Sequence, residues 1–253
     1  MPSFLPEFNL EKHPEPFFVK YFGYELEGLY DSDFGEYGED EDGNSERYNE
    51  YFKEDGSVSI SGNGIEGEIA SPKFRVDRME QFENFVNDNM PMDVNASCGL
   101  HCHLSFNNLL AYEKCMDSEY WIEFRKQVYE FVNPENFSEY TVDLFHDRYN
   151  NASTYCRDVH SPDGQVNSLW TDLVNNPHGR YTQLNYPFTS HGTIECRLFA
   201  PTSQPKEVIK IVNWFIDFTN SYLKKQTRER ANFETHIMKN QKERMYNEVF
   251  SCV

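Results

Sequence analysis

Positive charge is scarce in this chain of 253 residues. Lysine and arginine together number 23, against 42 aspartates and glutamates, and the formal net charge is −19. Proteins that bind a nucleic-acid backbone need a basic patch that displaces counterions, and anionic membranes attract basic segments. We therefore expect neither nucleic acid nor a membrane surface among the partners of this protein.

Long apolar runs and closely paired cysteines are absent as well. No segment reaches the ~20 apolar residues of a membrane-spanning helix, and residues 1–7 lack the basic start and apolar run of a secretion signal. The six cysteines include no Cys-x-x-Cys pair. We therefore expect free thiols rather than a disulfide framework, and a cytoplasmic location.

Aromatic residues, by contrast, are plentiful, at 21 Phe and 16 Tyr. They supply enough large apolar surface for a full core in a chain of this length. Apolar side chains recur at helical spacing over residues 77–88, 117–132 and 205–225. This spacing predicts three core helices, the first of them capped by Asp77. Asp55 and Gly56 predict a hairpin turn that continues into a strand over residues 57–60.

We expect three parts along the chain. Residues 1–16 form an extended arm, residues 17–225 one domain, and residues 226–253 a charged peripheral helix that faces solvent or a second copy of the chain. Within the domain, residues 31–50 contain nine carboxylates and one arginine. Such a segment cannot bury a core, and we interpret it as a solvated insertion. A gate or an acidic partner-binding loop is the alternative.

The segment most suggestive of chemistry is residues 98–106, Cys-Gly-Leu-His-Cys-His-Leu-Ser-Phe. Polar and apolar residues alternate here, which predicts a strand. His101 and His103 would then share one face of the strand, and Cys102 would point to the other. Two imidazoles on one face can bind a metal ion or a phosphate, whereas an isolated His-x-His is more often a hydrogen-bonded pair on a sheet surface.

Glutamates occupy comparable places in three other strand-like segments: Glu25 with Glu27, Glu68, and Glu195 with Arg197. Buried carboxylates repel one another and resist ionisation unless a cation compensates their charge. Glutamates that gather on one sheet face would therefore imply metal ions, arginines or both.

Six short motifs follow one another along the chain: Gly-Tyr-Glu-Leu-Glu-Gly, Asp-Gly-Ser, Glu-Ile-Ala-Ser-Pro, Cys-Gly-Leu-His-Cys-His-Leu-Ser, Arg-Tyr-Thr-Gln-Leu-Asn and Thr-Ile-Glu-Cys-Arg-Leu-Phe. Their order over residues 20–220 resembles the amidoligase family, relatives of glutamine synthetase and glutamate–cysteine ligase among the carboxylate–amine ligases. The resemblance implies an α+β fold in which a curved, mainly antiparallel sheet forms a funnel-like half barrel backed by helices, as in the catalytic domain of glutamine synthetase.

The resemblance also implies roles for single residues. The positions that match metal ligands are Glu25, Glu27, Glu68, His101 and Glu195. His101 and His103 match contacts to ATP. Arg180 and Arg197 match arginines that hold phosphate oxygens or the substrate carboxylate. The expected catalytic residues are Arg180, Arg197 and Glu68. The implied activity is an ATP- and Mg²⁺-dependent ligase, which joins a small-molecule or peptide carboxylate to an amine through an acyl phosphate. A histidine among the ligands leaves Mn²⁺ open.

Three other functions stay open on the sequence. The same fold supports phosphotransferases. A catalytically silent acidic binding protein, for example a nucleic-acid mimic, would suit the net charge of −19, but it would leave the candidate ligands unexplained. A metal hydrolase that uses His101 and His103 lacks a distinctive third-histidine motif. The ligase is therefore the leading hypothesis.

Overall fold

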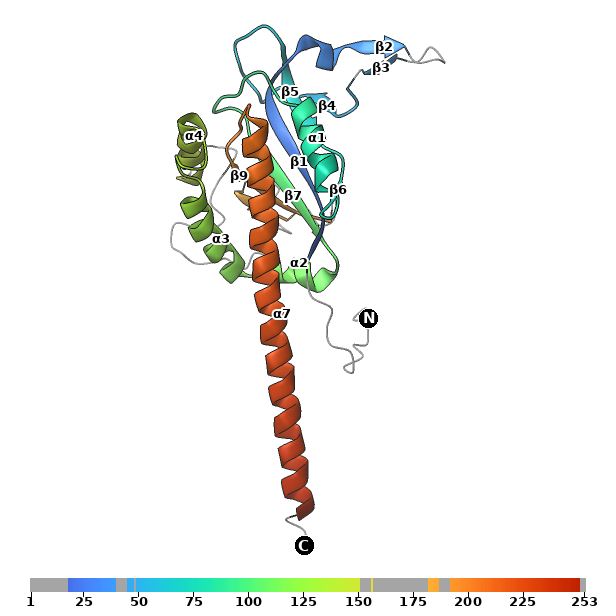
Figure 1. The fold of residues 1–253 in the computed structure, drawn as a ribbon, viewed down its shortest axis with the longest axis vertical. Helices are drawn as coiled ribbons and strands as arrows, with labels where there is room; N and C mark the ends of the chain where they lie inside the picture. Colours follow the sequence, from blue (N-terminus) through green and yellow to red (C-terminus); the bar gives the residue numbers. More distant parts are fainter. Residues whose placement is uncertain are drawn as a thin grey trace.

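The protein consists of two layers, an open, curved sheet and a set of helices that pack on one face of it (Figure 1). The computed structural model describes residues 18–39, 45–47, 49–150, 156, 182–186 and 192–250. The α+β class and the mainly antiparallel sheet expected from the resemblance are confirmed. The arm expected over residues 1–16 lies outside the described residues.

Strand β1 (Val19–Tyr30) is the long central strand of the sheet. The strand order is β4-β5-β1-β7-β9-β8, β6 also pairs with β1, and each of these pairs is antiparallel. The other strands are β4 (Phe52–Glu54), β5 (Ile65–Ala70), β6 (Phe74–Arg75), β7 (Leu100–Phe106), β8 (Leu184–Asn185) and β9 (Ile194–Phe199). Strand β1 therefore lies between the strand that carries Glu68 and the strand that carries the two histidines.

The helices form the other layer. They are α1 (Met79–Asp88), α2 (Leu109–Cys115), α3 (Ser118–Phe131), α4 (Glu139–Tyr149) and α7 (Pro205–Phe250). Figure 1 shows α7 running across the sheet between α1 on one side and α3 and α4 on the other. None of the described helices is long and apolar enough to cross a membrane.

The core lies between the two layers. Phe22, Tyr24 and Leu26 alternate along β1 and are at most 2% exposed, because they face the helices. On the helix side, the ring of Phe124 packs against three aromatic residues of α7, Trp214, Phe215 and Phe218. These contacts account for the aromatic richness of the sequence, since large rings fill a core between a sheet and helices efficiently.

Four of the five described cysteines, Cys102, Cys115, Cys156 and Cys196, belong to this core. Cys102 and Cys196 lie opposite each other on β7 and β9, and both are buried on the helix side of the sheet. The five described cysteines are free thiols, as the sequence predicted. Burial raises the pKa of the Cys102 and Cys196 thiols, which keeps them protonated and unreactive.

Helix α7 is longer than expected. The sequence predicted an end near residue 225, but the helix continues to Phe250 over 46 residues. Its apolar stripe fades in the second half, yet no glycine or proline interrupts residues 206–250, so no residue in this stretch breaks the backbone pattern. Figure 1 shows this part of α7 extending beyond the sheet and the other helices.

Two local predictions were wrong. Strand β4 pairs with β5 rather than with residues 57–60, and Val58 and Ile60 instead pack in a small cluster with Leu29. Asp77 does not cap α1, because its carboxylate accepts two hydrogen bonds from the Arg75 guanidinium at 2.9 and 2.7 Å. Local sequence patterns did not predict either feature. Strand β4 pairs with a strand that is more distant in the sequence, and Asp77 binds a charged side chain instead of a backbone N–H of α1.

The acidic insertion has short elements of its own. A 3₁₀ turn, η1 (Ser32–Gly35), follows β1, and β2 (Tyr37–Glu39) pairs with β3 (Ser45–Arg47) in a separate two-stranded sheet. Figure 1 shows this small sheet at one end of the molecule, beside the end of β1. The described residues of this segment therefore include regular elements, which its composition did not predict.

Candidate metal centre

The face of the sheet that the described helices leave open carries a band of carboxylates and imidazoles. Alternate residues of a strand point to the same face, so one set of positions on each strand contributes to this band. The strand register then sets three pairs directly opposite each other: Glu25 and His101, Glu27 and Glu68, and His103 and Glu195. Residues that are distant in the sequence thus meet on four neighbouring strands.

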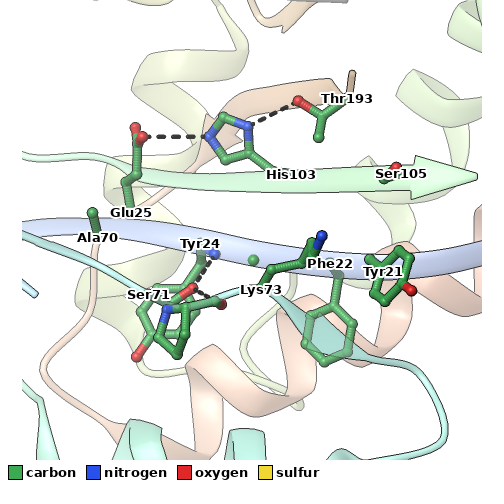
Figure 2. A pocket seen from close by; sticks show the side chains of 12 residues that line it. Tyr21, Phe22, Tyr24, Glu25, Ala70, Ser71, Lys73, His103, Ser105 and Thr193 are labelled. Carbon is green, nitrogen blue, oxygen red and sulfur yellow. Dashed lines mark hydrogen bonds and ion pairs between the residues drawn. The ribbon is translucent and has the colours of Figure 1, made fainter. Parts of the chain in front are cut away.

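Glu25 lies between the two imidazoles. Its Oε2 is 3.2 Å from Nδ1 of His101, and its Oε1 is 3.6 Å from Nε2 of His103. Nδ1 of His103 lies 3.3 Å from the hydroxyl oxygen of Thr193, as Figure 2 shows. The side chain of His101 is only 4% exposed, whereas that of Glu25 is 31% exposed. In this group of three side chains, His101 is therefore buried against the sheet, and Glu25 is the residue that solvent can reach.

Glu195 completes this first cluster and is fixed from both sides. Nη1 of Arg197 donates a hydrogen bond to its Oε1 at 2.6 Å, and Nδ2 of Asn185 donates to its Oε2 at 2.9 Å. Its Oε1 also lies 3.9 Å from Nδ1 of His101. A buried carboxylate with charge-assisted bonds to both oxygens keeps one orientation. Arg197 acts here as the residue that positions Glu195.

A second cluster lies next to the first, on the side of β5. Carboxylate oxygens of Glu27, Asp55 and Glu68 lie within 4.8 Å of one another. Nζ of Lys53 lies 3.6 Å from Oε1 of Glu68. Oε1 of Glu27 lies 4.0 Å from Nε2 of His101, so that His101 stands between the two clusters.

The first cluster holds its carboxylates ionised. Burial acts to raise the pKa of Glu25, but the hydrogen bond with His101 and the close contact with His103 outweigh it, and the pKa of Glu25 lies well below its usual range. Burial also acts against ionisation of Glu195, while the charge of Arg197 lowers its pKa on balance. For His103, burial lowers the pKa, but the close contact with the Glu25 carboxylate raises it overall.

Glu68 behaves in the opposite way. Burial and, next in size, the negative charge of Glu25 raise its pKa to about 7, and the positive charge of Lys53 offsets only part of this effect. Three carboxylates so close together repel one another unless a cation binds between them. The second cluster therefore has a charge imbalance that a divalent cation would relieve.

This imbalance gives a prediction for Glu68→Gln. The pKa of Glu68 is higher in the folded than in the unfolded chain, so ionising it costs folding free energy from about pH 4.5 upward, and the full cost is reached above about pH 7. We expect Glu68→Gln to stabilise the metal-free protein by on the order of 1–3 kcal/mol at about pH 8 and to have little effect at about pH 4. Urea unfolding at both pH values measures this, with Glu80→Gln on the exposed side of α1 as control. Destabilisation at the higher pH would contradict it.

The donor atoms of both clusters suit divalent cations. One atom each from Glu25, His103 and Glu195 lies within 4.8 Å of the others. Two ligands that each lie ~2.1 Å from one cation are at most ~4.2 Å apart, so the three side chains would have to move inward for their atoms to reach one cation. The all-oxygen second cluster suits Mg²⁺, and the imidazole of the first cluster also suits Mn²⁺.

Comparison with known proteins gives no further information on the candidate metal centre. No family model matches the chain. No curated protein matches it either. The relationship to the amidoligases therefore rests on the six sequence motifs and stays a prediction.

Of the eight residues predicted for the site, those that the structure describes lie together on the open face: Glu25, Glu27, Glu68, His101, His103, Glu195 and Arg197. Arg180 lies outside the described residues. The two histidines differ in position, because His103 joins the first three-residue group whereas His101 lies between the groups. The roles of the individual residues stay predictions.

Sequence reasoning missed Asp55 and Arg148. Asp55 was interpreted only as a turn residue. Arg148, at the end of α4, is 5% exposed and donates hydrogen bonds to the backbone oxygens of Cys98 and, at 2.9 Å, Arg197. The sequence does contain a pattern that predicts helix α4 and so the position of Arg148. Ser138, whose side chain caps α4, is followed by apolar residues at helical spacing.

Gly99 gives a second prediction, because a side chain there would enter the site. A Cβ at this position would lie 2.7 Å from Nε2 of His101, 3.1 Å from Nη2 of Arg148 and 3.2 Å from Oε2 of Glu27. We expect Gly99→Ala to displace His101 and to weaken Mn²⁺ binding by roughly 10- to 100-fold, as happens when ligand-orienting groups are disturbed. Calorimetric titration with Mn²⁺ measures the change. The control is Gly56→Ala, whose Cβ would meet nothing within 4 Å, and equal affinities in the two variants would refute the prediction.

A cavity of about 280 Å³ adjoins the first cluster. Glu25, His103 and Thr193 line it near the cluster, and Tyr21 and Lys73 line it farther along β1 (Figure 2). The candidate metal centre therefore opens onto a space that can hold a small molecule.

Proposed function

We propose that this protein is an ATP- and Mg²⁺-dependent carboxylate–amine ligase built on a glutamine synthetase-like catalytic sheet. One observation carries the proposal: carboxylates and imidazoles from four strands gather on the open face of one curved antiparallel sheet, next to a cavity. The six motifs that resemble the amidoligases supply these side chains. The reaction would join a carboxylate to an amine, of a small molecule or a peptide, and convert ATP to ADP and phosphate.

The two clusters would hold the cations. Glu25, His103 and Glu195 would bind one ion, and Glu27, Asp55 and Glu68 a second. Bound Mg²⁺, or Mn²⁺ at the histidine-containing cluster, would neutralise the charge on the phosphates as the γ-phosphoryl group moves to the carboxylate. The raised pKa of Glu68 supports this assignment, because burial and, after it, the charges of nearby carboxylates disfavour an ionised Glu68, and a bound cation would offset both effects.

Other residues of the chain would orient the ligands and supply positive charge. Asn185 and Arg197 fix both oxygens of Glu195, so this ligand would need little rearrangement on binding. Lys53 and Arg197 bring one cationic group to each cluster. Phosphate oxygens held between such groups and the cations would stay in the geometry that transfer requires.

Thermal unfolding with Mg²⁺ and ATP tests the proposal. We expect the two ligands together to raise the melting temperature by about 5–10 °C at a ligand concentration roughly 100-fold above the Kd, and each alone to raise it much less. A parallel assay follows ADP release, which should increase when a carboxylate and an amine are both added. ADP release that needs no amine would indicate a phosphotransferase. The absence of any shift would indicate a catalytically silent binding protein.

A further inference from the structure

The size of the cavity limits what it can hold. Its volume of about 280 Å³ lies just below the ~300–1,000 Å³ of typical small-molecule pockets, which suits a molecule of amino-acid size. Gly23 of β1 lies directly opposite His103 and lines the cavity without a side chain. A Cβ there would come within 3.3 Å of the Ser71 hydroxyl, so the glycine keeps this part of the cavity open.

The two ends of the cavity differ in charge. At the end next to the first cluster, the Glu25 carboxylate lines the cavity, and its side chain is 31% exposed. At the other end, Nζ of Lys73 lies 4.6 Å from the centre of the Tyr21 ring, and Figure 2 shows Lys73 and Tyr21 away from the group formed by Glu25, His103 and Thr193. Among the described residues, no carboxylate forms an ion pair with Lys73. Its ammonium group is therefore available to a ligand.

This polarity matches a ligand with one positive and one negative group. An ammonium group would be attracted to Glu25, and a carboxylate to Lys73. A dicarboxylate would bring two negative charges against a single lysine in a chain of net charge −19, and it would face Glu25 with a like charge. An amine without a carboxylate would leave Lys73 unmatched.

The distance between the ends sets the length of the ligand. Tyr21 and Glu25 are four positions apart on the same face of β1, which places their Cα atoms ~13 Å apart. Glycine separates its amine from its carboxylate by a single carbon atom and is short for this span. A ligand that reaches both ends needs several carbon atoms between the two groups.

We propose that this cavity binds the amine substrate, and that this substrate is an amino acid with its reacting amine several carbons from its carboxylate. The amine faces Glu25 beside the first cluster, and the carboxylate pairs with Lys73 over the Tyr21 ring. The inference rests on the proposed ligase, since it assigns one of the two substrates of that reaction. It makes Lys73 the residue that selects for a carboxylate.

Calorimetric titration of the full chain with four probes tests this assignment: ε-aminocaproate, glycine, hexylamine and hexanoate. We expect ε-aminocaproate to bind more tightly than the other three. Lys73→Gln should weaken its binding about fivefold, the upper range for a solvent-exposed ion pair. The matched control is Lys20→Gln, because Lys20 also lies over the Tyr21 ring, at 5.3 Å, but does not line the cavity. This control should bind as the unchanged protein does.

Three results would overturn the inference: no binding of ε-aminocaproate, equal binding by Lys73→Gln and the unchanged protein, or equal binding of hexylamine and ε-aminocaproate. The thermal shift with Mg²⁺ and ATP, measured on the same samples, separates this inference from the ligase. A shift without Lys73-dependent binding refutes the inference and leaves the ligase standing. Lys73-dependent binding without a shift refutes the ligase, and with it the assignment of the ligand as its amine substrate.

Discussion

Glu25→Ala is expected to abolish the stabilisation by Mg²⁺ and ATP and to lower the rate of ADP release by roughly 100- to 1,000-fold. Glu25 contacts both imidazoles and borders the cavity, so its loss removes a ligand and the group that orients His101 and His103. Its side chain is 31% exposed, so the fold should tolerate the change. The melting temperature with and without ligands, together with the ADP assay, measures both effects.

The control for this experiment is Glu80→Ala, which removes an exposed carboxylate from α1. It changes the net charge by the same amount, so it separates the loss of a ligand from a general electrostatic effect. We expect it to keep the full thermal shift and the full rate. If Glu25→Ala behaved in the same way as this control, the first cluster would have no part in the activity.

Glu207→Ala is expected to destabilise the protein by roughly 3–5 kcal/mol. Its carboxylate is buried and accepts three hydrogen bonds, from the backbone N–H of Ser138 at 2.6 Å and from the hydroxyls of Thr141 and Thr202 at 2.7 and 2.6 Å. These bonds connect the start of α4 to the start of α7. Removing the carboxylate leaves three donors without their acceptor, two of them buried hydroxyls, and unfolding in urea measures the cost.

Lys206→Ala, at the neighbouring exposed position, is the matched control and should change stability by less than about 0.5 kcal/mol. The position of α4 also determines where Arg148 meets the backbone of β9. We therefore expect Glu207→Ala to weaken Mn²⁺ binding as well as stability. A loss of less than about 1 kcal/mol would show that these hydrogen bonds contribute little net free energy.

The strands of the site were the most predictable part of the fold. Alternating polar and apolar residues identified β7 and β9 and placed His101 and His103 on one face and Cys102 on the other. The alternation has a physical cause, because one face of the sheet packs against helices and the other is left open. The same cause makes Cys102 and Cys196 core thiols.

Residue spacing did not predict which side chains of different strands would lie next to each other. The opposition of Glu27 and Glu68 depends on the register between β1 and β5, and a slip of one residue would turn Glu68 to the other face. Asp55 joins them only because β4 pairs with β5, whereas the local Asp-Gly signal predicted a different hairpin. Such long-range pairing is set by the packing of the whole sheet.

Helix α4 shows a different limit. The segment was not interpreted as a helix, although Ser138 caps it and Val142 and Phe145 are buried beneath it. Its residues include Tyr, Thr, Asp and His, which are weak helix formers. Its position is held by the buried contact with Glu207, a residue 66 positions from Thr141. Tertiary contacts of this kind leave no periodic signal in the sequence.

Diffraction from crystals soaked in Mn²⁺, with data collected to detect anomalous scattering, tests the metal centre most directly. The account predicts an anomalous peak within coordination distance of Glu25, His103 and Glu195, and a second peak or a bound Mg²⁺ among Glu27, Asp55 and Glu68. Crystals of Glu25→Ala should lack the first peak. No peak at either cluster at saturating Mn²⁺, or peaks only at other positions on the surface, would contradict the assignment of this face as a cation site and remove the basis of the proposed ligase.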